Sequence, residues 1–138
     1  MSSRVVTVSS AVGAGADVIR DSTVDTGLPP TASGSVPGER SDGRARPVGC
    51  CNHPLVDIGL PPGGIEQRIV RWTPGQAAPL HHTHSVDVDV VLSGSIDLVL
   101  RDGTVRLDAG DVVTVDGVVH GWNAGPEGCV MSVTLIAR

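Results

Sequence analysis

Short turn sequences recur at nearly even intervals through the second half of this 138-residue chain. They are Ser93-Gly94, Asp102-Gly103, Asp108-Ala109-Gly110-Asp111, Asp116-Gly117 and Ala124-Gly125-Pro126. Glycine beside a small or acidic residue is typical of tight turns. The segments between the turns are short, mostly apolar and rich in valine, and we predict strands at 96–101, 104–107, 112–115, 118–122 and 129–137. Since no segment shows a sustained 3.6-residue period, the pattern predicts an all-β sandwich or barrel with little helix.

The apolar residues available for a core are almost all aliphatic. The chain has no Phe or Tyr, and its two Trp residues are Trp72 and Trp122. Valine is the commonest apolar residue, and β-branched side chains fit a pleated, half-buried sheet better than a helix. This length supports one domain with one core. Closing the sheet into a barrel would also remove the unpaired edges of its valine-rich strands.

The N-terminal third is less regular than the rest of the chain. Residues 4–8 and 16–22 are predicted strands, with a turn at Gly13-Ala14-Gly15 between them. Residues 27–46 are rich in Gly, Pro, Ser and Arg, which favours a loop or arm. A strand at residues 65–73 carries Trp72. We therefore divide the chain into an arm with edge strands (1–47) and a barrel domain (48–138).

Charge and cysteine usage exclude several classes of partner. The net charge is −5 and the basic residues are scattered, so nucleic acid is not an expected partner. No apolar run approaches the ~18–20 residues that span a bilayer, and the first residues lack the apolar stretch of a signal peptide.

Cys50, Cys51 and Cys129 are a poor disulfide framework and predict reduced thiols in a cytoplasmic protein. Cys50-Cys51-Asn52-His53 has no second pair at zinc spacing, which favours ordinary thiols.

The densest group of chemically active side chains lies between Gly75 and Gly94. Three histidines and two aspartates follow one another there: His81, His82, His84, Asp87 and Asp89. Imidazole is a common metal ligand and proton carrier near neutral pH. Strand alternation puts four polar side chains on one face: His81, Thr83, Ser85 and Asp87. We expect this set to face the interior, because it aligns a histidine with a carboxylate, although a β-bulge would change the assignment.

A further histidine, His120, follows the Asp116-Gly117 turn, with Trp122 on the same strand face. His81, His120 and Asp87 together would form a two-histidine, one-carboxylate set, as used for open-sited iron(II). Without a metal, the same three residues would form an acid–base cluster in an apolar pocket. A second metal register uses His82, His84 and Asp89 in place of His81 and Asp87, and we rank it second.

The spacing of these residues resembles the first motif of the cupin superfamily of small β-barrels. That motif is Gly, five residues, His-x-His, three or four residues, Glu, six residues, Gly. Here Gly75, His81, Thr83, Asp87 and Gly94 fit the spacing. Gly110-Asp111, the Asp116-Gly117 turn and His120 resemble the second motif. The resemblance covers about residues 65–137 and implies a cupin-type double-stranded β-helix, or jelly-roll barrel.

Departures from the cupin pattern weaken the usual four-ligand metal site. Thr83 stands in place of the second histidine and Asp87 in place of the glutamate. A hydroxyl is a poor ligand for iron, nickel or zinc. The sequence also resembles a subgroup of single-domain cupins that carry His-x-Thr-x-Ser-x-Asp in the first motif and His-x-Trp in the second. Members of this subgroup are often found near natural-product pathways. We therefore leave the cofactor open, as none or a divalent metal (Fe, Zn, Ni or Mn).

The expected function is a small-molecule enzyme of secondary metabolism that catalyses a non-oxidative step. Cyclisation, dehydration, isomerisation or decarboxylation of a polyketide-like or similarly carbonyl-rich substrate are the candidates. The predicted catalytic residues are His81, Thr83, Asp87 and His120, with Asp87 orienting an imidazole. Predicted substrate contacts are Trp72, Ser85 and Trp122. The alternatives are an iron-dependent oxygenase that uses His81, His120 and Asp87, and a non-catalytic small-molecule binder. The resemblance also implies a homodimer.

Overall fold

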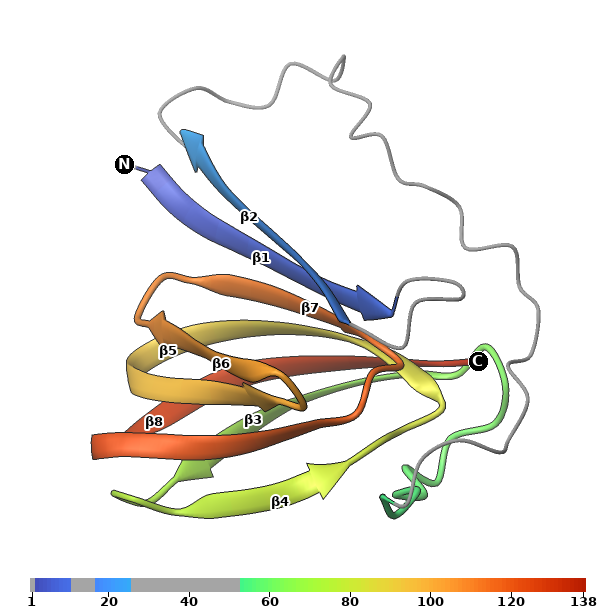
Figure 1. Ribbon diagram of the computed structural model, residues 1–138. Coiled ribbons are helices and arrows are strands. Elements are labelled where there is room, and N and C mark those ends of the chain that lie inside the picture. The colour runs from blue at the N-terminus through green and yellow to red at the C-terminus, as the bar shows by residue number, and fades with distance from the viewer. Residues whose placement is uncertain (1, 11–16, 26–52) are drawn as a thin grey trace.

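The computed structural model describes residues 2–10, 17–25 and 53–138, and within these ranges the chain is built from strands without helix (Figure 1). The strands are β1 (Ser2–Ser10), β2 (Asp17–Asp25), β3 (Ile65–Trp72), β4 (Ala77–His81), β5 (Ser85–Leu100), β6 (Gly103–Asp108), β7 (Val112–Asp116) and β8 (His120–Ala137). This confirms the predicted all-β class. The described residues accordingly include no helix of the length and apolarity that crossing a membrane requires.

Two long strands, β5 and β8, join the two layers of the barrel. The sheet order is β2-β1-β7-β5-β8-β3, while β6 pairs with β5 and β4 pairs with β8. The first half of β5 and the second half of β8 belong to one layer, and their other halves belong to the layer with β4 and β6. Figure 1 shows both strands turning back at the left-hand edge of the barrel.

The predicted turns at Ser93-Gly94 and Ala124-Gly125-Pro126 are wrong, because both lie inside these long strands. The pairing of β5 with β8 shifts register between Val91 and Ser93 and again between Gly94 and Ile96. These irregularities bend the ladder without ending the strands, as β-bulges do. The predicted strand lengths of four to nine residues are therefore too short for β5, with 16 residues, and β8, with 18.

Glycine is required where the two long strands bend. Gly94 has φ +72° and Gly128 has φ +76°, in the left-handed region that favours glycine. A Cβ on Gly94 would lie 2.1 Å from the carbonyl oxygen of Gly128. The last glycine of the first motif is thus a close backbone contact at the fold in the sheet.

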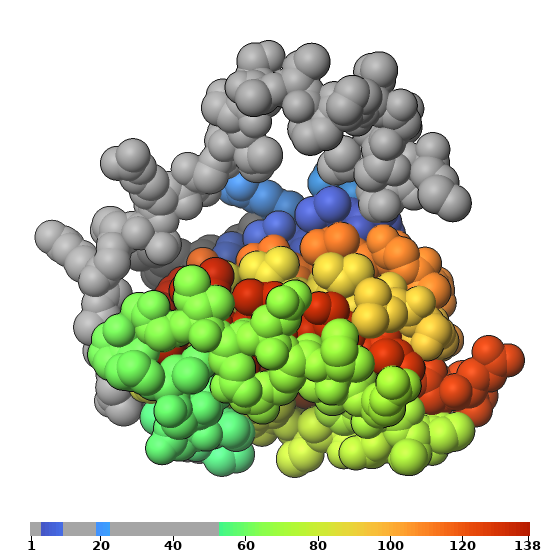
Figure 2. All heavy atoms as spheres, turned by 180° about the vertical axis from the view of Figure 1, so that it is seen from behind, coloured from blue at the N-terminus to red at the C-terminus, as the bar shows by residue number. Residues whose placement is uncertain are grey.

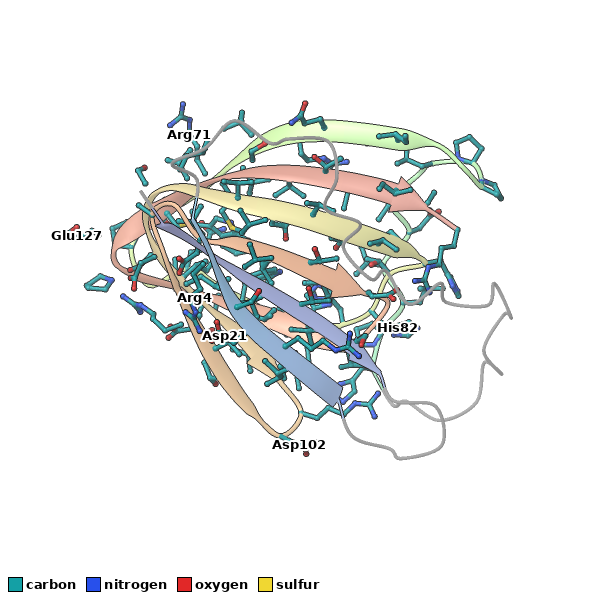
Figure 3. All side chains as sticks on the ribbon, turned by 90° about the horizontal axis from the view of Figure 1, so that it is seen from above. Arg4, Asp21, Arg71, His82, Asp102 and Glu127 are labelled. Carbon is teal, nitrogen blue, oxygen red and sulfur yellow. The ribbon has the colours of Figure 1, made fainter. Side chains whose placement is uncertain are left out.

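The N-terminal strands extend the larger layer. β1 pairs in parallel with β7 and antiparallel with β2, so β2 lies at the edge while β1 is internal to the sheet. Val6 and Val8 of β1 are fully buried in the core. Figure 3 shows Arg4 and Asp21 beside each other on β1 and β2, and their side chains form an ion pair with an N–O distance of 2.6 Å. Strand β1 is therefore part of the barrel core, while β2 forms the edge of the sheet.

Several predictions for the first half of the chain lie outside the described residues. These are the turn at 13–15, the loop at 27–46, Cys50 and Cys51, and the domain boundary at 47/48. The core of the described residues is aliphatic, as expected. Its largest fully buried side chains include Ile96, Leu98, Leu107 and Met131, which belong to β5, β6 and β8.

Candidate functional site

A cavity of about 450 Å³ opens between the two layers. Its wall is mostly apolar and includes Val70, Trp72, Ala78, Trp122, Met131, Val133 and Leu135. Its polar side chains are Arg68, His81, Thr83, Asp87, Asp89 and His120. A mainly apolar concavity with a few convergent polar groups is the usual form of a small-molecule site.

The segment that precedes β3 borders the opening of this cavity. Pro54, Val56 and Ile58 contribute to the lining. The backbone N–H of Val56 donates to the carbonyl of His82 over 2.8 Å, and the N–H of His82 donates to the carbonyl of Pro54 over 3.0 Å. In Figure 2 the green atoms of this segment and of β3 extend over the face opposite to that of Figure 1. The segment thus joins the histidine end of the barrel through backbone hydrogen bonds.

The structure brings His81 and His120 together in the cavity wall. His81 is the last residue of β4 and pairs with His120, the first residue of β8. Their ring centroids are 4.6 Å apart at an interplanar angle of 53°. His120 also meets the ring of Trp122 edge to face at 5.8 Å. Two histidines far apart in the sequence therefore lie side by side, as the motif spacing predicts.

Backbone carbonyls orient both imidazole rings. Nδ1 of His81 lies 2.8 Å from the carbonyl oxygen of Pro79, and Nδ1 of His120 lies 2.8 Å from that of Val118. A carbonyl oxygen only accepts, so Nδ1 donates in both cases. In the neutral rings Nε2 then carries a lone pair. We therefore assign the orienting role to these carbonyls, where the sequence analysis had assigned it to Asp87.

Burial controls the protonation of His120. The side chain is 2% exposed. Desolvation lowers the pKa of His120 to about 4, against the opposing effect of the Val118 carbonyl, and His81 and His82 lower it further. At neutral pH His120 is therefore an uncharged ring with an accepting Nε2.

Thr83, Ser85 and Asp87 form a short hydrogen-bonded chain on the inward face of β5 and the residues before it. All three are buried. Ser85 Oγ lies 2.8 Å from Thr83 Oγ1 and 2.5 Å from Asp87 Oδ1. Ser85 itself does not line the cavity, so it supports Asp87 from behind the wall. Burial raises the pKa of Asp87, while the Ser85 hydrogen bond and His81 oppose the rise.

Asp89 is a buried carboxyl that the sequence analysis placed only in the second-ranked register with His82 and His84. It lines the cavity and is 2% exposed. Among the described residues its Oδ1 has no hydrogen-bond partner. Burial, and next the nearby Asp87 carboxyl, raise the pKa of Asp89 to about 8. Strand alternation could have identified it, because Asp87 and Asp89 are two residues apart and share a face.

The remaining predicted site residues divide between the cavity and its surroundings. Trp72 and Trp122 line the cavity, and Trp72 Nε1 is a buried donor without a partner among the described residues. His84 is exposed and lines a separate hollow behind the 53–62 segment. His82 is half-buried, with its ring 6.3 Å from that of His84, and does not line the main cavity. His82 and His84 therefore lie outside the site.

The donor groups in the cavity do not form a metal-ligand set. In the ranges that the structure covers, no three His, Cys, Asp or Glu side chains lie close enough together to hold a metal ion. His81 and His120 offer two Nε2 atoms, but Asp87 is engaged with Ser85 instead of completing a third ligand position. The residues present thus do not fit a three-ligand iron site, and we derive no step through a metal.

Comparison with solved structures identifies the fold. A cupin domain of Schizosaccharomyces pombe Cnp3 aligns with 54% of this chain and 56% of its own, with 19% identity and a TM-score of 0.50. The chain has the cupin fold. This confirms the double-stranded β-helix predicted from the two motifs. No protein-family model matches the sequence.

Curated relatives match about half of this chain. Phomopsin biosynthesis cluster proteins C' and D of Diaporthe leptostromiformis are 48% identical over 81 residues, covering 56% of this chain and 43% of theirs. Oryzines biosynthesis cluster protein J of Aspergillus oryzae is 39% identical over 72 residues, covering 51% of this chain and 38% of its own. The matches thus span less than half the length of these relatives.

Proposed function

We propose that this chain is a small-molecule enzyme of natural-product biosynthesis that catalyses a non-oxidative step by acid–base chemistry in the cupin cavity. The observation that carries the proposal is the pair of imidazoles, His81 and His120, whose Nδ1 atoms are held by backbone carbonyls so that the reactive nitrogen of each ring is Nε2. The biosynthesis-cluster names of the curated relatives support the metabolic context.

The imidazoles supply the proton transfer. Either Nε2 can accept a proton from a carbon next to a substrate carbonyl, or from a substrate hydroxyl, and return it at another position. No redox change is involved in such a transfer, which suits cyclisation, dehydration, isomerisation or decarboxylation. General acid–base groups contribute roughly 10²- to 10⁴-fold to rate.

Asp87 and Thr83 contribute to substrate binding. A serine hydroxyl has one proton, so when Ser85 donates to an ionised Asp87, Thr83 donates to Ser85. The Thr83 oxygen then keeps a lone pair for a substrate hydroxyl. The apolar wall formed by Trp122, Met131 and Leu135 holds the carbon skeleton folded, and such positioning can remove much of the barrier to a cyclisation.

Turnover with candidate pathway intermediates, followed by mass spectrometry, tests this proposal. We expect loss of water, loss of carbon dioxide or no change in mass, at equal rates with and without dioxygen. Gain of oxygen atoms, or turnover that requires dioxygen, would contradict it. His120→Gln should lower kcat by about 10²-fold or more. Binding without turnover of any intermediate, together with unchanged affinity in His120→Gln, would instead indicate a non-catalytic binder.

A further inference from the structure

The burial of Asp89 has no explanation within the described part of the protein. The carboxyl lies in the cavity wall between two valines, because Asp89 pairs with Val113 on β7 and with Val133 on β8. Its Oδ1 is removed from solvent and accepts no hydrogen bond from any described residue. Buried polar atoms in proteins nearly always have a partner, and an unpaired one costs free energy. The partner of this oxygen should therefore come from the contents of the cavity.

A second unpartnered atom supports the same reading of the cavity. Trp72 Nε1 is also buried without a hydrogen-bond partner among the described residues, and Trp72 lines the same wall. An indole N–H only donates, whereas the Asp89 oxygen accepts. The wall thus presents one unused acceptor and one unused donor on an otherwise apolar surface, which suits a ligand with polar oxygen groups on an apolar skeleton.

We propose that Asp89 is a ligand-binding residue that accepts a hydrogen bond from a hydroxyl group, so that the natural ligand is an apolar molecule carrying at least one hydroxyl. The proposal rests on the proposed function in placing the substrate in this cavity. Arg68 also lines the cavity and lies in the same cross-strand row, on the far side of Val133, but it forms an ion pair with Glu66 over an N–O distance of 2.7 Å. A hydroxyl is favoured over an ammonium group because a cation would lose its hydration between Val113 and Val133, whereas a hydroxyl loses much less.

Matched probes test the hydrogen bond without requiring the natural substrate. We would measure by isothermal titration calorimetry how the protein binds 2-naphthol and its methyl ether, which differ in the hydroxyl donor. The wild-type protein should bind the naphthol about tenfold more tightly, because the ether leaves the Asp89 oxygen unpaired. Asp89→Leu should remove this preference, whereas Asp89→Asn should keep it, because the amide oxygen still accepts. The control Asp102→Leu removes an exposed carboxylate at the β5–β6 hairpin and should change nothing.

Three outcomes would overturn the inference. They are no measurable binding of 2-naphthol, equal affinity of both probes for the wild-type protein, and a preference that persists in a folded Asp89→Leu variant. The last outcome would mean that water, and not the ligand, satisfies Asp89. Circular dichroism establishes that each variant is folded, and Asp89→Leu should fold because its sheet neighbours are valines. Since the probes undergo no reaction, this test can fail while turnover at His81 and His120 succeeds, and the reverse.

Discussion

Replacing Asp89 by asparagine should change how the stability of the protein depends on pH. The folded-state pKa of Asp89 is raised to about 8 from 3.8, chiefly by burial. Below the unfolded-state pKa the carboxyl is protonated in both states. As the pH rises, ionisation stabilises the unfolded chain alone until the folded-state pKa is reached. Asp89 therefore lowers the stability of the wild-type protein progressively between about pH 4 and pH 8, and Asp89→Asn should not show this loss.

The size of the effect follows from the shift in pKa. Each pKa unit corresponds to 1.36 kcal/mol, so between about pH 4.5 and pH 7.5 the linkage for Asp89 is on the order of 4 kcal/mol. The quantity to compare is the free energy of unfolding of Asp89→Asn minus that of the wild-type protein, and it should rise by this amount over the interval. His120 is present in both proteins, so its own titration cancels in the difference.

Urea unfolding followed by tryptophan fluorescence measures this difference, because Trp72 and Trp122 both lie in the cavity wall. With a urea slope of about 2 kcal/mol/M, typical of a small domain, the midpoint difference should grow by about 2 M. Asp102→Asn is the control, since Asp102 is exposed at the hairpin tip (Figure 3). A difference that stays constant within about 1 kcal/mol would show that the Asp89 carboxyl ionises normally in the fold.

Three further predictions concern the histidine pair, the bend and metals. The wild-type protein should lose about 3 kcal/mol of unfolding free energy as the pH falls from about 6.5 to 4, because the folded-state pKa of His120 is lowered to about 4. His120→Gln should not show this loss in urea unfolding, and parallel plots of unfolding free energy against pH for the two proteins would refute the prediction. Gly94→Ala should lower the thermal midpoint severely or prevent folding, because its Cβ would overlap the Gly128 carbonyl; wild-type stability would contradict the bend geometry. Dialysis against a chelator should leave turnover and the thermal midpoint unchanged, because the described residues form no three-ligand set.

The sequence identified the fold through turn chemistry and motif spacing, but it placed two bends as turns. Ser93-Gly94 has the composition of a turn, and Gly94 does adopt a positive φ. Whether such a glycine ends a strand or bends it depends on the strand opposite. Here β8 continues to pair on both sides of Gly94, because Ser93 pairs with Val130 and Ile96 pairs with Ala124. A local signal cannot contain that information, because the partner lies some 30 residues away.

The site was predictable where it depends on spacing and alternation, and unpredictable where it depends on the backbone. The juxtaposition of His81 with His120 follows from the two motifs. Orientation of their rings by the carbonyls of Pro79 and Val118 could not be read, because every residue carries a carbonyl. Asp89 was accessible to the alternation rule. The sequence pairs it with His82 and His84 instead, because Asp87 already occupies the carboxylate position of the first motif.

The pKa shifts of His120 and Asp89 both favour the uncharged form of the side chain. Burial keeps His120 uncharged by lowering its pKa and keeps Asp89 protonated at neutral pH by raising its pKa. His120 then offers an accepting Nε2, and the protonated Asp89 carboxyl keeps an accepting carbonyl oxygen for a ligand hydroxyl, so neither group adds a net charge to the apolar wall. A neutral substrate can therefore enter the cavity without lying against a buried charge. The stability that Asp89 costs at neutral pH is consistent with a group retained for ligand binding or reaction, since residues that only support a fold are seldom buried unpaired.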